Sequence, residues 1–189
     1  MEPIETIVYH QPEWLQPKTF QNRFELRDEE RVFAALEFPK MFGSLATATT
    51  SAASWTFKRV GFFNTRITVR GENLDEDLAV YHPRWTGTQG TLDLGGDTRY
   101  TWKVANFWAT QFVWETADGK PLITYRPGVE AGNMTDWFKM QARVEFSPEA
   151  AAGDFRKTET FALLVTLGWY LMLLKYQDDS AATVAATAS

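Results

Sequence analysis

The strongest chemical signal in the chain lies in residues 58–70. This segment holds four basic residues and no acidic residue, although the chain has a formal net charge of −5. If residues 61–64 form the tip of a hairpin, two phenylalanines protrude there with the cations behind them. A hairpin with an apolar tip and basic residues behind it is typical of proteins that dock on anionic lipid, where each basic residue near the surface contributes about 1 kcal/mol to membrane binding. The candidate lipid-binding residues are therefore Lys58, Arg59, Phe62, Phe63, Arg66 and Arg70.

A purely structural interpretation of the same segment is also open. In it, Phe62 and Phe63 fold back to cap one end of the fold, and the basic residues are solvated strand residues. In both interpretations the alternation of side chains predicts that Ile67 and Val69 face inward and that the arginines flanking them face outward.

Elsewhere the sequence offers no convergent set of catalytic or metal-ligating residues. Its two histidines are His10 and His82, and His82 has no identifiable partner that would orient it as a catalytic base. The chain contains no cysteine, and two histidines alone do not predict a zinc site. Residues 72–77 are rich in carboxylates but lack the spacing of a calcium-binding loop, which predicts a solvated turn. We expect no catalytic residues, no metal site and no cofactor, and hence a protein that is not an enzyme.

Strand signals recur at short intervals along most of the chain. Turn residues separate runs of β-branched and aromatic residues, and in the last run, residues 137–146, apolar and polar side chains alternate. The predicted strands are residues 20–26, 32–38, 55–60, 66–70, 78–81, 91–94, 100–104, 111–115, 122–126 and 137–146, with hairpin turns at 28–30, 61–64 and 118–119. Because closure removes exposed strand edges, we predict a mainly β fold, a closed antiparallel β-barrel of about 12 strands.

The longest apolar run, residues 161–174, contains no charged residue. A helix over residues 158–176 would be apolar on every side, so it must lie either in lipid or wholly inside the protein. The apolar run spans about 21 Å as a helix, short of the roughly 30 Å of a bilayer's hydrocarbon. A barrel of about twelve strands also has an interior too wide for its own side chains to fill. We therefore predict a central, C-terminal hydrophobic α-helix inside the barrel, in preference to a membrane anchor.

Length and composition predict one domain for the 189 residues. We expect an irregular N-terminal segment (1–19), a barrel with its central helix (20–176) and a disordered tail (177–189). The acidic N-terminus has no secretory signal and no segment is predicted to cross a membrane, so we expect a cytoplasmic protein, free or peripheral to a membrane. The negative net charge argues against a general nucleic-acid binder, which needs a broad cationic field.

The C-terminal part of the sequence has a distinctive order of elements. A last strand that ends at residues 146–148 is followed by a linker with Lys157 and then by a near-terminal apolar helix. In this order the chain resembles the phospholipid scramblase and LURP-one-related group of the tubby C-terminal-like superfamily. Residues 100–104 and the turn at 118–119 also fit, so the resemblance covers roughly residues 20–176. It implies a twelve-stranded barrel around a central hydrophobic helix.

The resemblance also bears on ligands. Tubby domains bind phosphoinositide headgroups through surface cations, which favours the lipid-binding interpretation of residues 58–70. In scramblases an acidic stretch around the last strand is associated with calcium. The comparable segment here holds Asp136, Glu145 and Glu149 with basic residues between them, which puts calcium dependence in doubt.

Two functions follow from these patterns. The first is a non-enzymatic barrel that binds anionic membrane lipid, or an unknown protein partner, at its surface. The alternative is an intracellular barrel that carries a small apolar ligand. The predicted helix argues against the alternative, because it occupies the cavity that a ligand would need.

Overall fold

The structure is a computed structural model that describes residues 1–18, 22–40, 43–61, 64–84, 87–106, 108, 110–128 and 140–187. For residues 184–187 it describes the helix backbone without the side chains.

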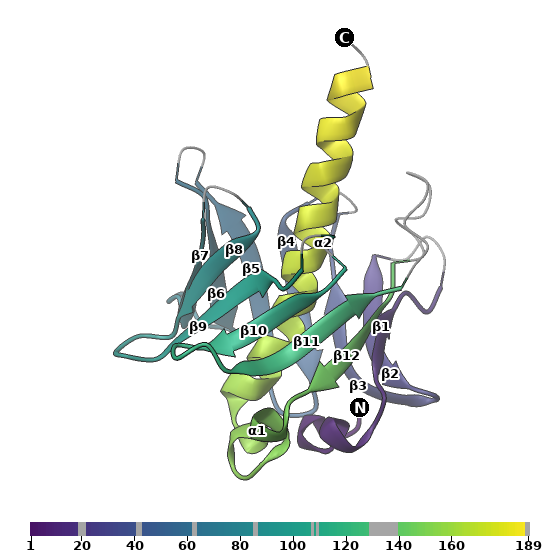
Figure 1. Ribbon diagram of the computed structural model, residues 1–189, viewed down its shortest axis with the longest axis vertical. Coiled ribbons are helices and arrows are strands. Elements are labelled where there is room, and N and C mark those ends of the chain that lie inside the picture. Colours follow the sequence, from purple (N-terminus) through teal and green to yellow (C-terminus); the bar gives the residue numbers. More distant parts are fainter. Residues whose placement is uncertain are drawn as a thin grey trace.

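Within the described residues, twelve strands form one closed antiparallel barrel, which confirms the predicted fold class (Figure 1). The strands are β1 (Glu13–Leu15), β2 (Arg23–Asp28), β3 (Arg31–Glu37), β4 (Leu45–Thr50), β5 (Ser54–Val60), β6 (Arg66–Gly71), β7 (Ala79–Pro83), β8 (Gln89–Asp93), β9 (Arg99–Val104), β10 (Phe112–Thr116), β11 (Pro121–Pro127) and β12 (Ala142–Phe146). Each strand pairs with its neighbours in the sequence, and β1 closes the barrel against β12. The predicted hairpins are β2–β3, β5–β6 and β10–β11. In such a meander, successive connections alternate between the two ends of the barrel.

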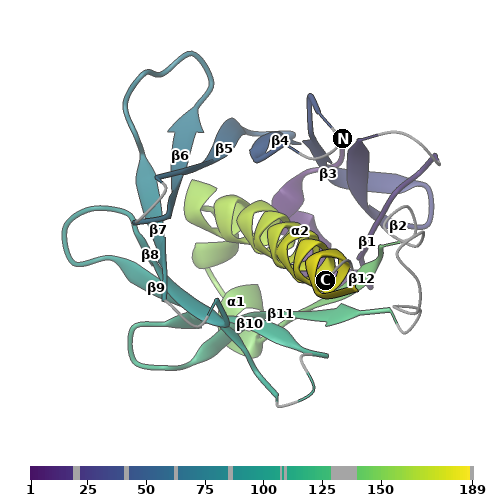
Figure 2. The same ribbon diagram turned by 90° about the horizontal axis from the view of Figure 1, so that it is seen from above.

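Helix α2 (Glu159–Thr187) passes through the centre of the ring of strands, as Figure 2 shows. Every residue from 161 to 174 is buried, and the inward-facing side chains of the strands pack against the helix. This confirms the predicted central hydrophobic helix. In the described part of the chain, no helix combines the length and the apolar character needed to cross a membrane.

Two strand side chains hold α2 by its backbone. Trp114 of β10 donates a hydrogen bond from Nε1 to the carbonyl of Leu164 at 2.9 Å. Tyr125 Oη of β11 lies 3.0 Å from the same carbonyl and 2.9 Å from the carbonyl of Val165. Gly168 permits this approach, because a Cβ there would lie 2.5 Å from Tyr125 Oη and 2.8 Å from Trp114 Nε1. These contacts fix the height and rotation of the helix in the barrel.

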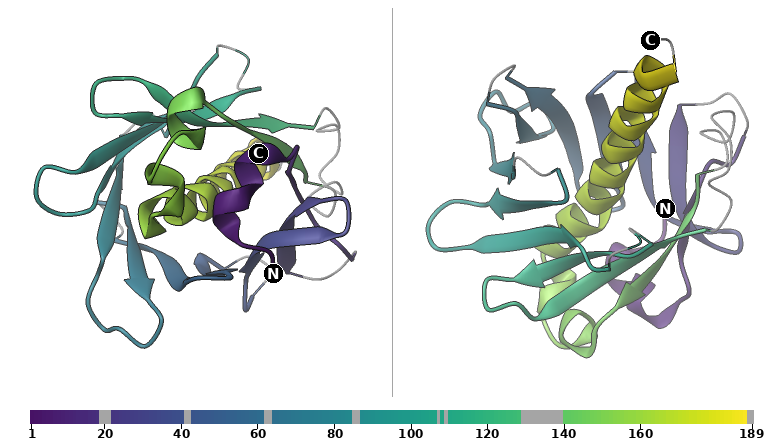
Figure 3. Two further views of the ribbon diagram at one scale, coloured as in Figure 1. Left: turned by 90° about the horizontal axis from the view of Figure 1, so that it is seen from below. Right: turned by 45° about the horizontal axis from the view of Figure 1, so that its top comes forward.

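The two ends of the barrel differ. At the end where α2 begins, which we call the capped end, η1 (Ile4–Tyr9), α1 (Pro148–Ala151) and η3 (Phe155–Lys157) gather, and η1 and α1 lie across the opening (Figure 3, left). At the other end, which we call the exit end, α2 leaves the barrel and its last turns stand clear of the strands (Figure 3, right). Residues 178–183 of this projecting part are exposed.

Several predicted strand boundaries differ from the structure. The N-terminal segment, expected to be irregular, contains η1 and β1, and β4 is missing from the predicted strands. β1 has only three residues, too few to show a period, and the inward positions Ala46 and Ala48 of β4 are small, so neither strand shows an alternation of large apolar residues. The strand expected over residues 137–146 begins at Ala142, and residues 137–139 lie outside the described residues.

The tail expected to be disordered is instead helical as far as Thr187. Residues 177–187 contain several alanines and no proline or glycine. Because the buried segment already forms the costly nucleus, each further residue extends the helix with little penalty. The helix therefore continues beyond the barrel that encloses its first half.

Candidate functional site

The basic segment predicted from the sequence forms the β5–β6 hairpin, whose two strands pair over their full length. Ile67 and Val69 are buried against the core, as predicted. Lys58, Arg66 and Arg70 are exposed on the outer face. The alternation of the pleat thus places three of the four cations toward solvent.

Two of the predicted cations, Arg59 and Arg70, are engaged in ion pairs. Arg59 belongs to the inward-facing row of β5, and its Nη1 donates to both carboxylate oxygens of Asp178 on α2, at 2.9 and 2.7 Å. Arg70 lies at the capped end of β6, and its Nε donates to Asp77 at 2.7 Å. Neither charge belongs to a free basic surface beside the hairpin tip.

Lys58 and Arg66 are the members of the predicted site that lie together, on the outer face near the exit end. Neither side chain forms an ion pair or hydrogen bond with another residue that the structure describes. Phe62 and Phe63 lie outside the described residues. Of the six predicted lipid-binding residues, Lys58 and Arg66 are therefore the two whose charges have no partner among the described residues.

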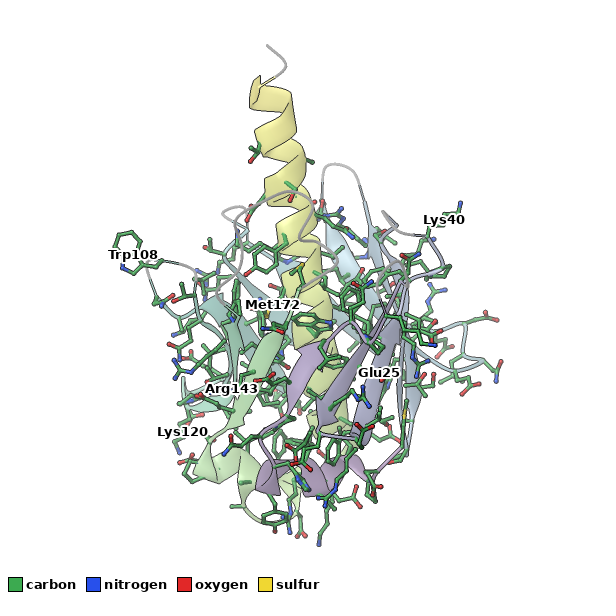
Figure 4. All side chains as sticks on the ribbon, turned by 90° about the vertical axis from the view of Figure 1, so that its right-hand side faces the viewer. Glu25, Lys40, Trp108, Lys120, Arg143 and Met172 are labelled. Carbon is green, nitrogen blue, oxygen red and sulfur yellow. The ribbon has the colours of Figure 1, made fainter. Side chains whose placement is uncertain are left out.

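Three further cations lie in the described parts of the exit-end connections. Lys18 follows β1, Lys40 follows β3 and Arg84 follows β7, and all three are exposed. Like the two hairpin cations, they have no ion-pair or hydrogen-bond partner for their side chains among the described residues. The described parts of the exit-end connections contain no acidic residue. Figure 4 shows Lys40 toward this end, across the barrel from Trp108, which is 78% exposed.

The capped end has the opposite charge. The few cations in its connections have partners: Lys120 pairs with Asp118 and Lys157 with Asp154, both at 3.4 Å, and Arg156 bonds to a tyrosine. The acidic residues in these connections are Glu2, Glu5, Glu29, Glu30, Glu72, Asp75, Glu76, Asp77, Asp97, Asp118, Glu149 and Asp154. The residues that the structure describes therefore place opposite charges at the two ends of the barrel axis.

Between the two ends, basic and acidic residues on the outer wall form ion pairs, so their charges cancel. Arg126 of β11 lies 2.8 Å from Glu145 of β12, and Arg143 of β12 lies 3.4 Å from Glu13 of β1, across the seam that closes the barrel. Figure 4 shows Arg143 and Glu25 on this wall, and Glu25 pairs with arginines of its own strand. Exposed pairs contribute about 0–1 kcal/mol each. Among the described residues, the cations without an ion-pair or hydrogen-bond partner are thus concentrated at the exit end.

Helix α2 leaves through the exit end with its own charges compensated. Asp178 is held by Arg59, and Asp179 accepts a hydrogen bond from Lys175 Nζ at 2.9 Å. In the sequence no charged residue follows Asp179. The projecting helix therefore does little to cancel the positive charge around it.

The two histidines lie apart from each other. His82 is exposed on the outer face of β7. His10 Nδ1 lies 2.8 Å from Asp28 Oδ2, and its ring packs against Phe33 with centroids 5.1 Å apart. This pair joins the N-terminal segment to β2. Within the described ranges, no group of three or more side chains is arranged to hold a metal ion.

Sequence reasoning missed Lys18, Lys40 and Arg84 because each is unremarkable in its own segment. What joins them is topology: they follow β1, β3 and β7, and every second connection of a meander lies at the same end. Summing the charges of every second connection along the sequence would have identified these three residues as a group at one end. That sum requires the correct strand count, including β1 and β4.

No family model, curated protein or solved structure matches the chain. The resemblance to the tubby C-terminal-like superfamily therefore rests on the order of elements alone.

Proposed function

We propose that the protein is a non-enzymatic, cytoplasmic barrel that binds peripherally to anionic membrane lipid. The observation that carries this proposal is the pair Lys58 and Arg66, which point outward near the exit end without an ion-pair partner among the described residues. Their charges are free to meet lipid headgroups, at about 1 kcal/mol each. The resemblance to a superfamily in which tubby domains bind phosphoinositides through surface cations supports the same function.

The interior of the barrel favours surface binding over the carriage of a small apolar ligand. Helix and strands meet directly: Trp14 stacks on Trp169 with ring centroids 5.7 Å apart, and Phe57 lies 5.3 Å from Tyr170. A carried ligand would have to displace α2, which supplies a large part of the core. A lipid that copurifies at one molecule per chain in native mass spectrometry would reverse this conclusion.

Sedimentation with vesicles that contain phosphatidylserine tests the proposal. Wild-type protein should bind, and the variant Lys58→Gln/Arg66→Gln should partition about 30-fold less, which corresponds to about 2 kcal/mol. The matched control is Arg99→Gln/Lys120→Gln, which removes the same charge from ion pairs near the capped end. It should change binding less than about twofold, because these positions lie beyond the screening length of about 10 Å.

Two results would contradict the proposal. One is wild-type protein that ignores phosphatidylserine vesicles at low salt. The other is a capped-end control that weakens binding as much as the hairpin variant, because binding would then follow net charge and not the position of the charge.

A further inference from the structure

We infer that the described basic residues of the exit end form the docking face, so that the barrel stands upright on an anionic bilayer with α2 directed into it. This inference rests on the proposed function. It adds the orientation of the bound protein and three basic residues outside the hairpin.

The five described cations without partners all lie at this end. Lys58 and Arg66 belong to the hairpin, while Lys18, Lys40 and Arg84 follow three other strands. They come from alternate positions around β1 to β7, so they extend along the rim and do not form a single cluster. A flat anionic surface can meet all of them at once only if the barrel axis is steep to that surface.

The charge at the two ends would favour the same orientation before contact. The capped end carries the acidic connections and would be repelled by an anionic surface, whereas the exit end would be attracted. The two aspartates where α2 emerges, Asp178 and Asp179, are paired with Arg59 and Lys175 and cancel little of this attraction. A separation of charge along one axis turns a protein as it approaches a charged partner.

The projecting part of α2 favours a bilayer over a rigid anionic partner. From Asp178 to Thr187 the helix extends about 14 Å at 1.5 Å per residue, and it is uncharged after Asp179. This projection would hold a nucleic-acid duplex or a folded acidic protein away from the rim. Lipid headgroups, unlike the surface of a folded partner, can move aside to admit an uncharged helix end. Trp108, exposed at the same end, is a residue type enriched at membrane interfaces.

The first experiment compares two triple variants on phosphatidylserine vesicles at low salt. Lys18→Gln/Lys40→Gln/Arg84→Gln leaves the hairpin intact and should lower the partition coefficient about a hundredfold, since each basic residue near the surface is worth about a factor of five. The control Arg99→Gln/Lys120→Gln/Lys157→Gln has the same charge and residue types at the capped end and should change it less than about threefold.

The outcomes separate this inference from the proposed function. If the Lys58 and Arg66 variant loses binding but the exit-end triple variant does not, the protein docks by the hairpin alone and the upright orientation is wrong. If wild-type protein does not bind the vesicles, the proposed function fails too. If wild-type protein binds a short RNA duplex more tightly than the vesicles, the exit end serves nucleic acid and the inference is overturned.

The second experiment measures the orientation directly. Because the chain has no cysteine, Ala182→Cys and Ala117→Cys each provide one site for an environment-sensitive dye. Ala182 is exposed on the projecting part of α2, and Ala117 is exposed in the β10–β11 turn at the capped end. On anionic vesicles the dye at position 182 should shift to the blue and be quenched by lipid-borne quenchers, and the dye at 117 should not. A dye at 182 that stays in water on bound protein overturns the upright orientation.

Discussion

Gly168 is the position at which the packing of α2 can be tested with a single methyl group. The Cβ of an alanine there would lie 2.5 Å from Tyr125 Oη and 2.8 Å from Trp114 Nε1, whereas ordinary contacts are 3.4–4 Å. Both rings are fully buried, so neither can swing into solvent to make room. The substitution must therefore displace the rings or push the helix away from β10 and β11.

Two opposing effects set the stability of Gly168→Ala. Alanine favours the helix over glycine by about 1 kcal/mol. Against this, overpacking costs about 1–3 kcal/mol, and a buried polar group that loses its partner costs about 1–3 kcal/mol. The groups at risk are the indole and phenol donors that bond to the carbonyls of Leu164 and Val165. We expect a net loss of about 1–5 kcal/mol in the free energy of unfolding, or roughly 2–20 °C in Tm.

Urea and thermal unfolding, followed by circular dichroism, measure this loss. The control is Ala182→Gly in the exposed end of α2, which reports helix propensity alone and should cost no more than about 1 kcal/mol. A Gly168→Ala protein as stable as the wild type, or more stable, would show that the helix backbone is not docked against Tyr125 and Trp114. The packing described for the barrel interior would then be wrong.

Three further substitutions or conditions test other parts of the structure. Leu167→Asp places a charge at a fully buried position and should abolish cooperative thermal unfolding, whereas a retained cooperative melt would mean that the helix is not enclosed. Burial raises the pKa of Tyr125 and of Tyr170 above the usual value of 10.0. The unfolded chain loses these protons above about pH 10, while the folded chain keeps them. Stability to urea should therefore fall as the pH rises above about 10, and below that pH it should not depend on these two groups. Tyr125→Phe should make this fall smaller, and an unchanged dependence of stability on pH would exclude Tyr125 as a cause. Arg59 and Asp178 are partly exposed, so a double-mutant cycle with Arg59→Gln and Asp178→Asn should give a coupling below about 1 kcal/mol, and a coupling of several kcal/mol would show a dry contact there instead.

Much of the fold is readable from the sequence because it depends on periodicity. The alternation around Ile67 and Val69 predicts which side of β6 faces the core, and the unbroken apolar run at 161–174 predicts a helix enclosed on all sides. β4 escapes prediction for a physical reason. Its inward residues Ala46 and Ala48 are small in a crowded interior, so the strand shows no large apolar period.

The candidate site is less predictable because it depends on which charges meet in three dimensions. Arg59 and Lys58 are adjacent in the sequence, yet the pleat sends Arg59 inward to an aspartate that lies more than a hundred residues later in the chain. Conversely, Lys18 and Arg84 are far apart in the sequence but lie at the same end of the barrel. Such long-range pairing leaves no local pattern, so sequence reasoning finds the basic segment but not its free members.

The partition coefficient of the wild-type protein on vesicles, measured against phosphatidylserine content and salt, tests membrane docking most directly. Docking through the exit-end cations predicts binding that requires phosphatidylserine and weakens steeply as the Debye length falls from about 10 Å at 0.1 M salt to about 3 Å at 1 M. Equal binding to uncharged phosphatidylcholine vesicles, or no binding to phosphatidylserine vesicles at about 0.1 M salt, would contradict it.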